Sequence, residues 1–259
     1  ALDTATWEAV QAKAAAGVAE LAREILRREA QRKAQGGHAF SGDSHLEKEF
    51  GESFPYEETP DQKKAIEATL RDLMAPHPMD RVVVGDVGFG KTEVAMRAAL
   101  KVVLAARRVA VLVPTTVLAD QHTEVFRKRL STLPINIERL TRLESEKKYN
   151  EILRGLANGT VDIVIGTHRL LGKNIQLKTS GLLIVDEEQR FGVSHKEAIK
   201  ERYPSIDILY LSATPIPRTL AFSLSGIRPL SQLKEAPRGR MAPLTNVLPN
   251  SSKIIKAAL

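Results

Sequence analysis

Five short apolar runs, rich in Val, Ile and Leu, constrain the fold of this 259-residue chain more than any other feature. Each run is nearly continuous, which is typical of strands buried on both faces of a parallel sheet. Amphipathic stretches rich in Ala and Leu separate the runs and predict crossover helices. The expected strands are Arg81–Val84, Val109–Val113, Asp162–Ile165, Leu182–Val185 and Ile206–Leu211. We therefore expect an α/β fold, a parallel sheet with helices on both faces, and ligands at the carboxyl ends of its strands.

A glycine-rich segment, Gly85–Thr92 (GDVGFGKT), follows the first expected strand directly and leads into a helix-forming run. Its glycines are Gly85, Gly88 and Gly90. These residue types, at this spacing between a strand and a helix, match the P-loop, whose backbone N–H groups curl around phosphate oxygens. The pattern predicts that Lys91 reaches the β- and γ-phosphates of a nucleotide and that the Thr92 hydroxyl is a ligand of Mg²⁺.

Acidic residues follow the expected strand Leu182–Val185, in the run Asp186-Glu187-Glu188-Gln189. A magnesium nucleotide needs a second protein ligand for the metal and a group that positions the attacking water. Asp186, at the end of the strand, suits the metal, and Glu187 suits the water as a base or orienting group. Together with Lys91, these two acids are the expected catalytic residues. Nucleotide hydrolysis is therefore the leading reaction.

Two further clusters each have a structural and a functional interpretation. Ser212-Ala213-Thr214-Pro215 is either a helix cap or, because it follows another strand, a sensor of the acidic turn. Gln62 lies in Thr59-Pro60-Asp61-Gln62, which is typical of a helix start. Alternatively, its amide binds adenine, with Phe54 or Tyr56 stacked on the base. Taken alone, both patterns favour the helix cap, and only their order among the other motifs supports the functional interpretations.

Composition excludes several classes of protein. With 43% hydrophobic and 27% charged residues, the chain matches an average globular protein and not a disordered or collagen-like one. Its apolar runs fall far short of the ~20 residues that a membrane-spanning helix needs, so we expect no membrane partner. The sequence contains no cysteine, as is common in the reducing cytosol. A formal net charge of +7 suits a polyanion such as nucleic acid, or ordinary solubility.

We expect four regions along the chain. Residues 1–36 form an amphipathic connector helix, because apolar residues recur there at helical spacing. Residues 37–58 form a loop and a short helix, and residues 59–228 form the nucleotide-binding lobe. Prolines interrupt residues 229–259, where we expect a linker and the start of a missing second lobe. The first residue is Ala1 rather than Met, which indicates a fragment or a processed product.

Several segments, in their order along the chain, resemble the motifs of the first RecA-like lobe of superfamily 2 helicases and translocases. They are Gln62, the P-loop, Val113–Thr116, Gly166–Leu170, Asp186–Gln189 and Ser212–Thr214. More narrowly, the chain resembles the bacterial transcription-repair coupling factors, whose relatives are the RecG-like helicases. The segments that carry this closer resemblance are Asp86–Ala99, Arg190–Val193, Ala213–Leu220 and the leading helix with Ala14–Ala34.

The resemblance implies a RecA-like P-loop fold and a motor that uses ATP and Mg²⁺ to translocate on double-stranded DNA. Such a motor displaces stalled RNA polymerase and recruits excision-repair proteins, in the cytoplasm and associated with the nucleoid. The residues that match DNA-binding positions of the family are Thr115, Thr116, Thr167, His168 and Arg169. Those that match positions coupling hydrolysis to DNA are Gln189, Ser212 and Thr214. Gln189 stands where many relatives have His.

Motors of this kind close their site with a second RecA-like lobe, which supplies an arginine finger. Because we expect that lobe to be missing, the chain should bind Mg-nucleotide weakly and hydrolyse it very slowly. A RecG-like, fork-remodelling helicase shares every motif, and the leading helix distinguishes the two. Alternatively, the fragment is an interaction module in which the Trp7–Ala34 helix docks a partner and the nucleotide acts as a switch.

Overall fold

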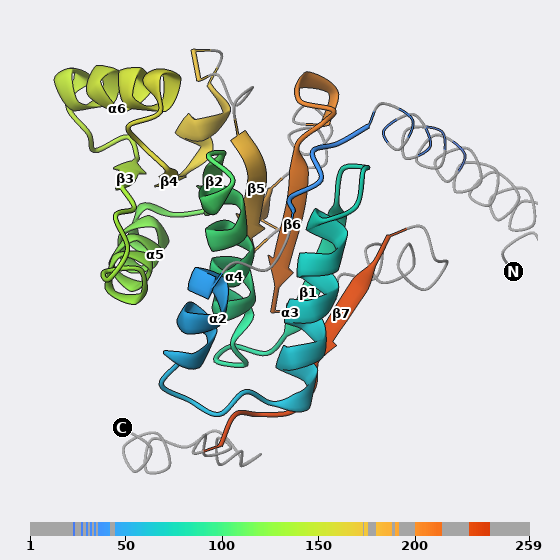
Figure 1. The fold of residues 1–259 in the computed structure, drawn as a ribbon. Coiled ribbons are helices and arrows are strands. Elements are labelled where there is room, and N and C mark those ends of the chain that lie inside the picture. Colours follow the sequence, from blue (N-terminus) through green and yellow to red (C-terminus); the bar gives the residue numbers. More distant parts are fainter. Residues whose placement is uncertain are drawn as a thin grey trace, which may run out of the picture.

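The structure of the chain is a computed structural model, which describes residues 36–41, 45–172, 174–175, 180–187, 190–191, 200–213 and 228–238, and five single residues. These five are Arg23, Arg27, Ala30, Arg32 and Ala34. The described residues form one sheet with helices packed against its two faces (Figure 1). Most of the expected connector helix, residues 1–36, lies outside the described residues, as does the end of the chain from residue 239.

The sheet of the described chain has seven strands in the order β3-β4-β2-β5-β6-β1-β7, and every neighbouring pair is parallel. The strands are β1 (Asp80–Gly85), β2 (Arg108–Leu112), β3 (Ile137–Leu140), β4 (Ile163–Gly166), β5 (Ser180–Asp186), β6 (Asp207–Ser212) and β7 (Leu230–Leu233). The parallel sheet and all five strands expected from the sequence are confirmed, with ends shifted by one or two residues. The central strand β5 is buried along its whole length, as its continuous apolar run predicted.

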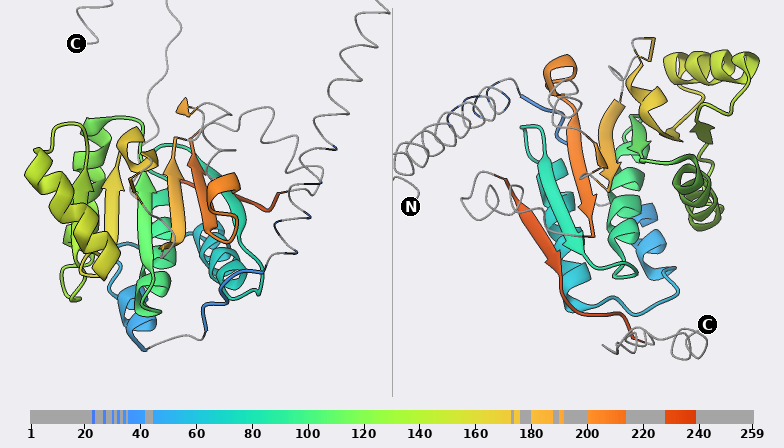
Figure 2. Two further views of the ribbon diagram at one scale, coloured as in Figure 1. Left: turned by 90° about the horizontal axis from the view of Figure 1, so that it is seen from above. Right: turned by 180° about the vertical axis from the view of Figure 1, so that it is seen from behind.

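Helices connect the strands and cover the sheet. They are α2 (His45–Glu52), α3 (Pro60–Leu73), α4 (Lys91–Leu104), α5 (Thr116–Arg129), α6 (Glu146–Asn158) and the 3₁₀ helix η1 (His168–Leu171). Helices α2 to α5 pack on one face, whereas α6 and η1 pack on the other (Figure 2). No helix in the described part of the chain combines the length and the apolar character needed to cross a bilayer.

Alternate residues of each strand enter two separate hydrophobic cores. Val83 and Leu209 belong to the core beneath α2 to α5, while Val82 and Ile208 belong to the core on the face of α6. This alternation follows from the two-residue period of a strand, and β1 and β6 are in register as neighbours. Two filled cores hold the sheet rigid, so that the loops at its carboxyl edge start from fixed positions.

Two strands lie outside the sequence expectation. β3 is only four residues long and carries Glu138 and Arg139 between its apolar ends, so no continuous apolar run marks it. β7 lies in the segment that we expected to be a linker, and it pairs in parallel with β1. The sheet therefore extends beyond residue 228, to Leu233.

Candidate nucleotide-binding site

The segment Gly85–Thr92 forms the turn between β1 and α4, as the sequence predicted. Gly88 and Gly90 have φ angles of +81° and +86°, in the left-handed region that glycine adopts without strain. A side chain at Gly90 would also collide with the amide of Gln62. Residues 86–88 are exposed, so the loop offers its backbone to solvent in front of the amino end of α4.

The Lys91 side chain is folded back onto its own loop. Its Nζ atom donates hydrogen bonds to the carbonyl oxygens of Gly85, at 2.6 Å, and Asp86, at 3.0 Å. Both acceptors belong to the segment that would surround a phosphate. The ammonium group therefore already lies in the loop, within reach of an anion that the loop would bind.

Gln62 links the start of α3 to the P-loop. Its Oε1 accepts the backbone N–H of Thr59 at 2.9 Å, and the Thr59 hydroxyl accepts the N–H of Gln62 at 3.2 Å. Its Nε2 donates to the carbonyl of Phe89 at 2.9 Å. The helix-cap interpretation is thus confirmed. A role toward adenine stays a prediction, which would use the second N–H and the second lone pair of the amide.

The two aromatic residues proposed for base stacking differ in exposure. Phe54 is half-buried, between Tyr56, whose ring centroid is 5.5 Å away, and the guanidinium of Arg129, at 5.6 Å. Tyr56 is 69% exposed. Both line a cavity of about 480 Å³ that also includes Arg97. Tyr56 therefore offers a base the more open ring of the two.

The carboxyl ends of three adjacent strands carry the expected chemistry. Asp186 ends β5, Ser212 ends β6 and Gly85 ends β1, and the three strands are neighbours in that order. Asp186 is 8% exposed, and Glu187 after it has a φ angle of +53°, a strained conformation for a residue with a side chain. Strain of this kind is concentrated at functional sites. Gln189 and Thr214, expected beside these residues, lie outside the described residues.

The carboxylate of Asp186 is held from two sides. Its Oδ1 accepts the backbone N–H of Glu187 at 3.0 Å, and its Oδ2 lies 2.8 Å from Nε2 of His122 in α5. His122 is itself buried. The sequence predicted no role for His122, because the contact joins residues 64 positions apart and no local pattern indicates it.

The oxygen donors at this edge fit a magnesium ion. No group of three or more metal-binding side chains occurs among the described residues. Mg²⁺ does not need such a group, since it is usually bound by one or two protein oxygens together with phosphates and water. The hydroxyl of Thr92 and the carboxylate of Asp186 are donors of this type, and Thr92 is partly accessible at the start of α4.

The expected DNA contacts lie farther along the same edge. Thr115 is exposed and caps α5 after β2, where its hydroxyl accepts the N–H of Leu118 at 3.2 Å. Thr116 follows it as the first residue of α5. After β4, Thr167 is buried, with no hydrogen-bond partner for its hydroxyl among the described residues, whereas His168 is exposed. β2 and β4 are adjacent, so these residues share one stretch of the sheet edge.

The side chain of Arg169 is half-buried and is held by neighbouring residues. Its guanidinium donates to the carbonyl of Thr141 at 3.1 Å, pairs with Glu146 at 3.3 Å and lies 4.2 Å from the ring centroid of Tyr149. These contacts hold α6 against the end of β3. Arg142, next to Thr141, is exposed instead. The sequence predicted no role for Thr141 and Arg142, because they follow β3, which carries no continuous apolar run.

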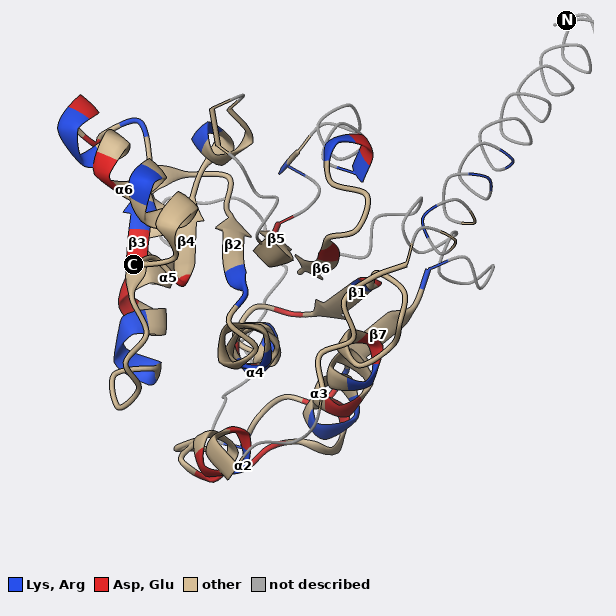
Figure 3. Cartoon of the chain, turned by 45° about the horizontal axis from the view of Figure 1, so that its top comes forward, with Lys and Arg blue, Asp and Glu red and all other residues tan. Residues whose placement is uncertain are grey.

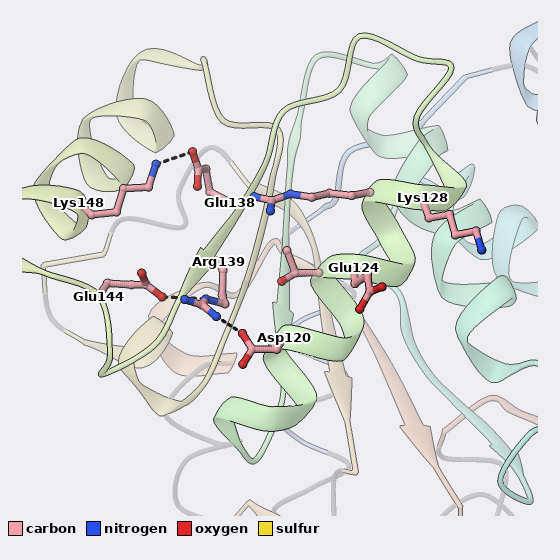
Figure 4. A pocket seen from close by; sticks show the side chains of 9 residues that line it. Asp120, Glu124, Lys128, Glu138, Arg139, Glu144 and Lys148 are labelled. Atoms are coloured by element: carbon pink, nitrogen blue, oxygen red, sulfur yellow. Dashed lines mark hydrogen bonds and ion pairs between the residues drawn. The ribbon is translucent and has the colours of Figure 1, made fainter.

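A charged groove of about 690 Å³ lies between α5, β3 and α6 (Figure 4). Basic and acidic segments alternate along these three elements (Figure 3). Arg139 pairs with both Asp120 and Glu144, whose hydrogen bonds raise the pKa of Arg139, and Lys148 pairs with Glu138 at 2.8 Å. These ion pairs connect α5, β3 and α6 to one another. Because the cations are paired with carboxylates, the groove does not resemble a phosphate site.

The P-loop, the acids after β5 and the parallel sheet together define a known class of protein. The family model described as DEAD/DEAH box helicase matches residues 59–222. The chain belongs to this family. Within it, the chain is 47% identical over 253 residues to a transcription-repair-coupling factor of Bacillus subtilis, covering 98% of this chain and 22% of that protein. It is 50% identical over 253 residues to one of Escherichia coli, with the same two coverages.

Solved structures of helicases have the same fold. A structure of RecG bound to a three-way DNA junction matches with a TM-score of 0.71 and 33% identity, over 85% of this chain and 30% of that one. The resemblance to the transcription-repair coupling factors and the RecA-like fold, both predicted from the motifs, are confirmed. This DEAD/DEAH box helicase chain spans about a fifth of the length of the coupling factors it matches.

Proposed function

We propose that the chain is the ATP-binding lobe of a double-stranded DNA translocase that displaces stalled RNA polymerase and couples transcription to excision repair. One observation carries the proposal: the P-loop, Ser212 and the Asp186-Glu187 pair lie on three adjacent strand ends, in a chain about half identical to transcription-repair-coupling factors. The RNA polymerase and the repair proteins would be bound by other parts of the full-length protein.

Each residue of the site has a definite task in the proposed hydrolysis. The backbone N–H groups of the loop and the Lys91 ammonium bind the β- and γ-phosphates. Thr92 and Asp186 would hold Mg²⁺, which would neutralise charge on the phosphate oxygens. Glu187 orients a water and accepts its proton as the water oxygen bonds to the γ-phosphorus and ADP leaves. Gln62 keeps the loop attached to α3.

The DNA side of the lobe grips phosphates without reading bases. Thr115 and Thr116 offer hydroxyl and backbone groups, and His168 and Arg142 are exposed at the same edge. Thr167 is buried, so its hydroxyl is not offered to a duplex in this structure. Contacts of this kind fix the position of a duplex but carry no sequence information. We expect Arg142 to serve the role that the family resemblance assigned to Arg169.

The lobe alone should be a poor ATPase. A second RecA-like lobe would close over the nucleotide and supply an arginine finger, which in related phosphoryl transfer raises the rate by about 10³–10⁵. The isolated chain keeps the phosphate loop and the metal ligands. It should therefore bind Mg-nucleotide weakly and turn it over very slowly.

A RecG-like helicase that remodels forked DNA is the second candidate. Its support is the likeness to RecG on a three-way junction. The connector helix that distinguishes the two lies mostly outside the described residues. Substrates separate the candidates: a coupling factor removes a stalled RNA polymerase from duplex DNA, whereas a fork remodeller acts on branched DNA without polymerase.

ATP turnover tests the proposal most directly. The measurement compares this chain with a version extended through the second lobe, with and without duplex DNA, and uses Glu187→Gln as the control. We expect only the extended protein to hydrolyse ATP, faster with DNA, and Glu187→Gln to lower that rate at least a hundredfold. If nucleotide binds but neither protein turns it over, the site is a switch in an interaction module. Turnover by the isolated chain at the rate of the extended protein would contradict the need for a second lobe.

A further inference from the structure

His122 connects helix α5 to Asp186, at the proposed nucleotide site. It lies on the buried face of α5, and its Nε2 is 2.8 Å from Oδ2 of Asp186, the expected ligand of Mg²⁺. A carboxylate oxygen only accepts, so the imidazole donates through Nε2. The other ring nitrogen, Nδ1, is buried and has no hydrogen-bond partner within the described residues. Among those residues, Asp186 is therefore the hydrogen-bond partner of the imidazole.

Helix α5 is also attached to the DNA side of the sheet edge. It begins at Thr116, six residues before His122, which is about 9 Å along a helix at 1.5 Å per residue. On its groove-facing side, Asp120 pairs with Arg139, and Arg139 pairs with Glu144 at 2.8 Å (Figure 4). Glu144 lies in the turn that carries Arg142. Two of the candidate DNA-contacting segments, Thr115–Thr116 and the turn that carries Arg142, therefore connect to α5.

We propose that His122 is a positioning residue that orients the carboxylate of Asp186 and, through α5, couples DNA binding to the nucleotide site. The inference rests on the proposed function, because it takes Asp186 as a metal ligand and the sheet edge as the DNA surface.

The two donors to Asp186 differ in a way that makes this coupling possible. The N–H of Glu187 belongs to the same strand end as Asp186, so it moves with the carboxylate. His122 belongs to α5, so a shift of that helix changes the hydrogen bond at Oδ2 alone. A ligating carboxylate that loses a hydrogen-bonding partner typically loses 10- to 100-fold in metal affinity or activity. Coupling between two binding sites is reciprocal, so nucleotide should also change DNA affinity.

Three variants of this chain test the inference by binding rather than turnover. His122→Leu removes the donor and keeps much of the volume, and His122→Gln keeps an N–H of similar reach. Gln121→Ala, at the exposed neighbouring position of α5, is the matched control. The probe is a fluorescent ATP analogue, titrated in Mg²⁺ and in EDTA, and duplex DNA is titrated with and without that analogue.

We expect Mg²⁺ to strengthen analogue binding to the wild type, and His122→Leu to reduce that gain about tenfold. His122→Leu should also remove the effect of the analogue on DNA affinity, while His122→Gln and Gln121→Ala retain both effects. If the wild type binds no analogue, the proposed function itself fails. If it binds and His122→Leu keeps the full magnesium gain, only the role of His122 is overturned. Should His122→Leu melt early, His122→Asn, whose shorter amide loses the contact, replaces it against His122→Gln.

Discussion

Asp207 has its carboxyl group buried at the amino end of β6, the opposite end from Ser212. The residue is 2% exposed, and its Oδ1 accepts the N–H of Met79 at 2.5 Å. Its Oδ2 has no hydrogen-bond partner among the described residues. Burial raises the pKa of Asp207 to about 7, although the Met79 hydrogen bond and the charge of Arg32 oppose this. In the native protein the carboxyl group of Asp207 therefore stays neutral at pH values at which an ordinary Asp side chain is ionised.

This raised pKa predicts that Asp207 makes stability fall as the pH rises. Between about pH 4 and pH 7 the carboxyl is ionised when the chain is unfolded but protonated when it is folded, so the native state binds more protons. The contribution is fully present below the unfolded pKa and is lost as the pH rises through the folded one. We expect wild type to lose roughly 2 kcal/mol relative to Asp207→Asn between pH 5 and pH 8, measured by urea denaturation.

Asp207→Asn isolates the effect of this one group. Asparagine keeps an acceptor for the Met79 N–H and cannot ionise, so the other titrating groups cancel in the comparison. A constant difference in unfolding free energy between the two proteins from pH 5 to pH 8 would contradict the raised pKa.

The sequence predicted those site residues that directly follow a strand recognisable from its own apolar run. The P-loop, Asp186, Glu187 and Ser212 each follow a recognisable strand, so a parallel sheet had to bring them to one edge. The contact between His122 and Asp186 depends on how α5 packs beneath the sheet. No spacing in the sequence encodes a packing contact of that kind. The contacts of Arg169 with Thr141, Glu146 and Tyr149 could not be predicted for the same reason.

At the level of elements, two arginines and one acid fasten α2 to the P-loop helix. Glu93, in the first turn of α4, is 5% exposed and pairs with Arg97 at 2.8 Å and Arg129 at 3.0 Å. Arg129 also lies 3.8 Å from the ring centroid of Phe50 and donates to the Phe50 carbonyl at 2.7 Å. These contacts join α2, α4 and α5, and the first two of these helices also line the candidate base-binding cavity.

Replacing Arg129 should cost more than an ordinary surface change. Arg129→Ala leaves the buried carboxylate of Glu93 with one cation instead of two and removes the stacking on Phe50. We expect a loss of about 2–3 kcal/mol in the free energy of unfolding, measured by urea denaturation. Lys128→Ala, which removes the same charge from an exposed neighbouring position, should stay within about 0.5 kcal/mol of wild type. Equal losses in both variants would show that the buried cluster contributes nothing specific.

The strands that the sequence did not predict are the two edges of the sheet. β3 and β7 each have one neighbour and four residues, and in both strands two polar residues stand between apolar ends. An edge strand is less buried than a central one, so its sequence does not need a continuous run of apolar residues. The five inner strands are buried on both faces, so their sequences are continuous apolar runs that could be recognised as strands.

At the scale of the whole molecule, the net positive charge of +7 would act on DNA only where cations are exposed at the proposed DNA-binding edge. Arg142 is exposed there, whereas the guanidinium of Arg169 is held by Thr141, Glu146 and Tyr149. A phosphate contact releases counterions, so each one steepens the dependence of log affinity on log salt by about 0.9. The two arginines should therefore differ in solution even though both are near the same edge.

We expect Arg142→Ala to weaken duplex binding equally for any sequence and to reduce the salt slope by about 0.9. Arg169→Ala should leave that slope unchanged and lower the free energy of unfolding by about 1 kcal/mol, because the Thr141 carbonyl loses a donor and Tyr149 its stacked cation. Fluorescence anisotropy with two unrelated duplexes over a range of salt, together with urea denaturation, measures both quantities. A reduced slope for Arg169→Ala and not for Arg142→Ala would mean that Arg169 leaves its internal partners when DNA binds. The family position, and not the exposed one, would then hold the phosphate.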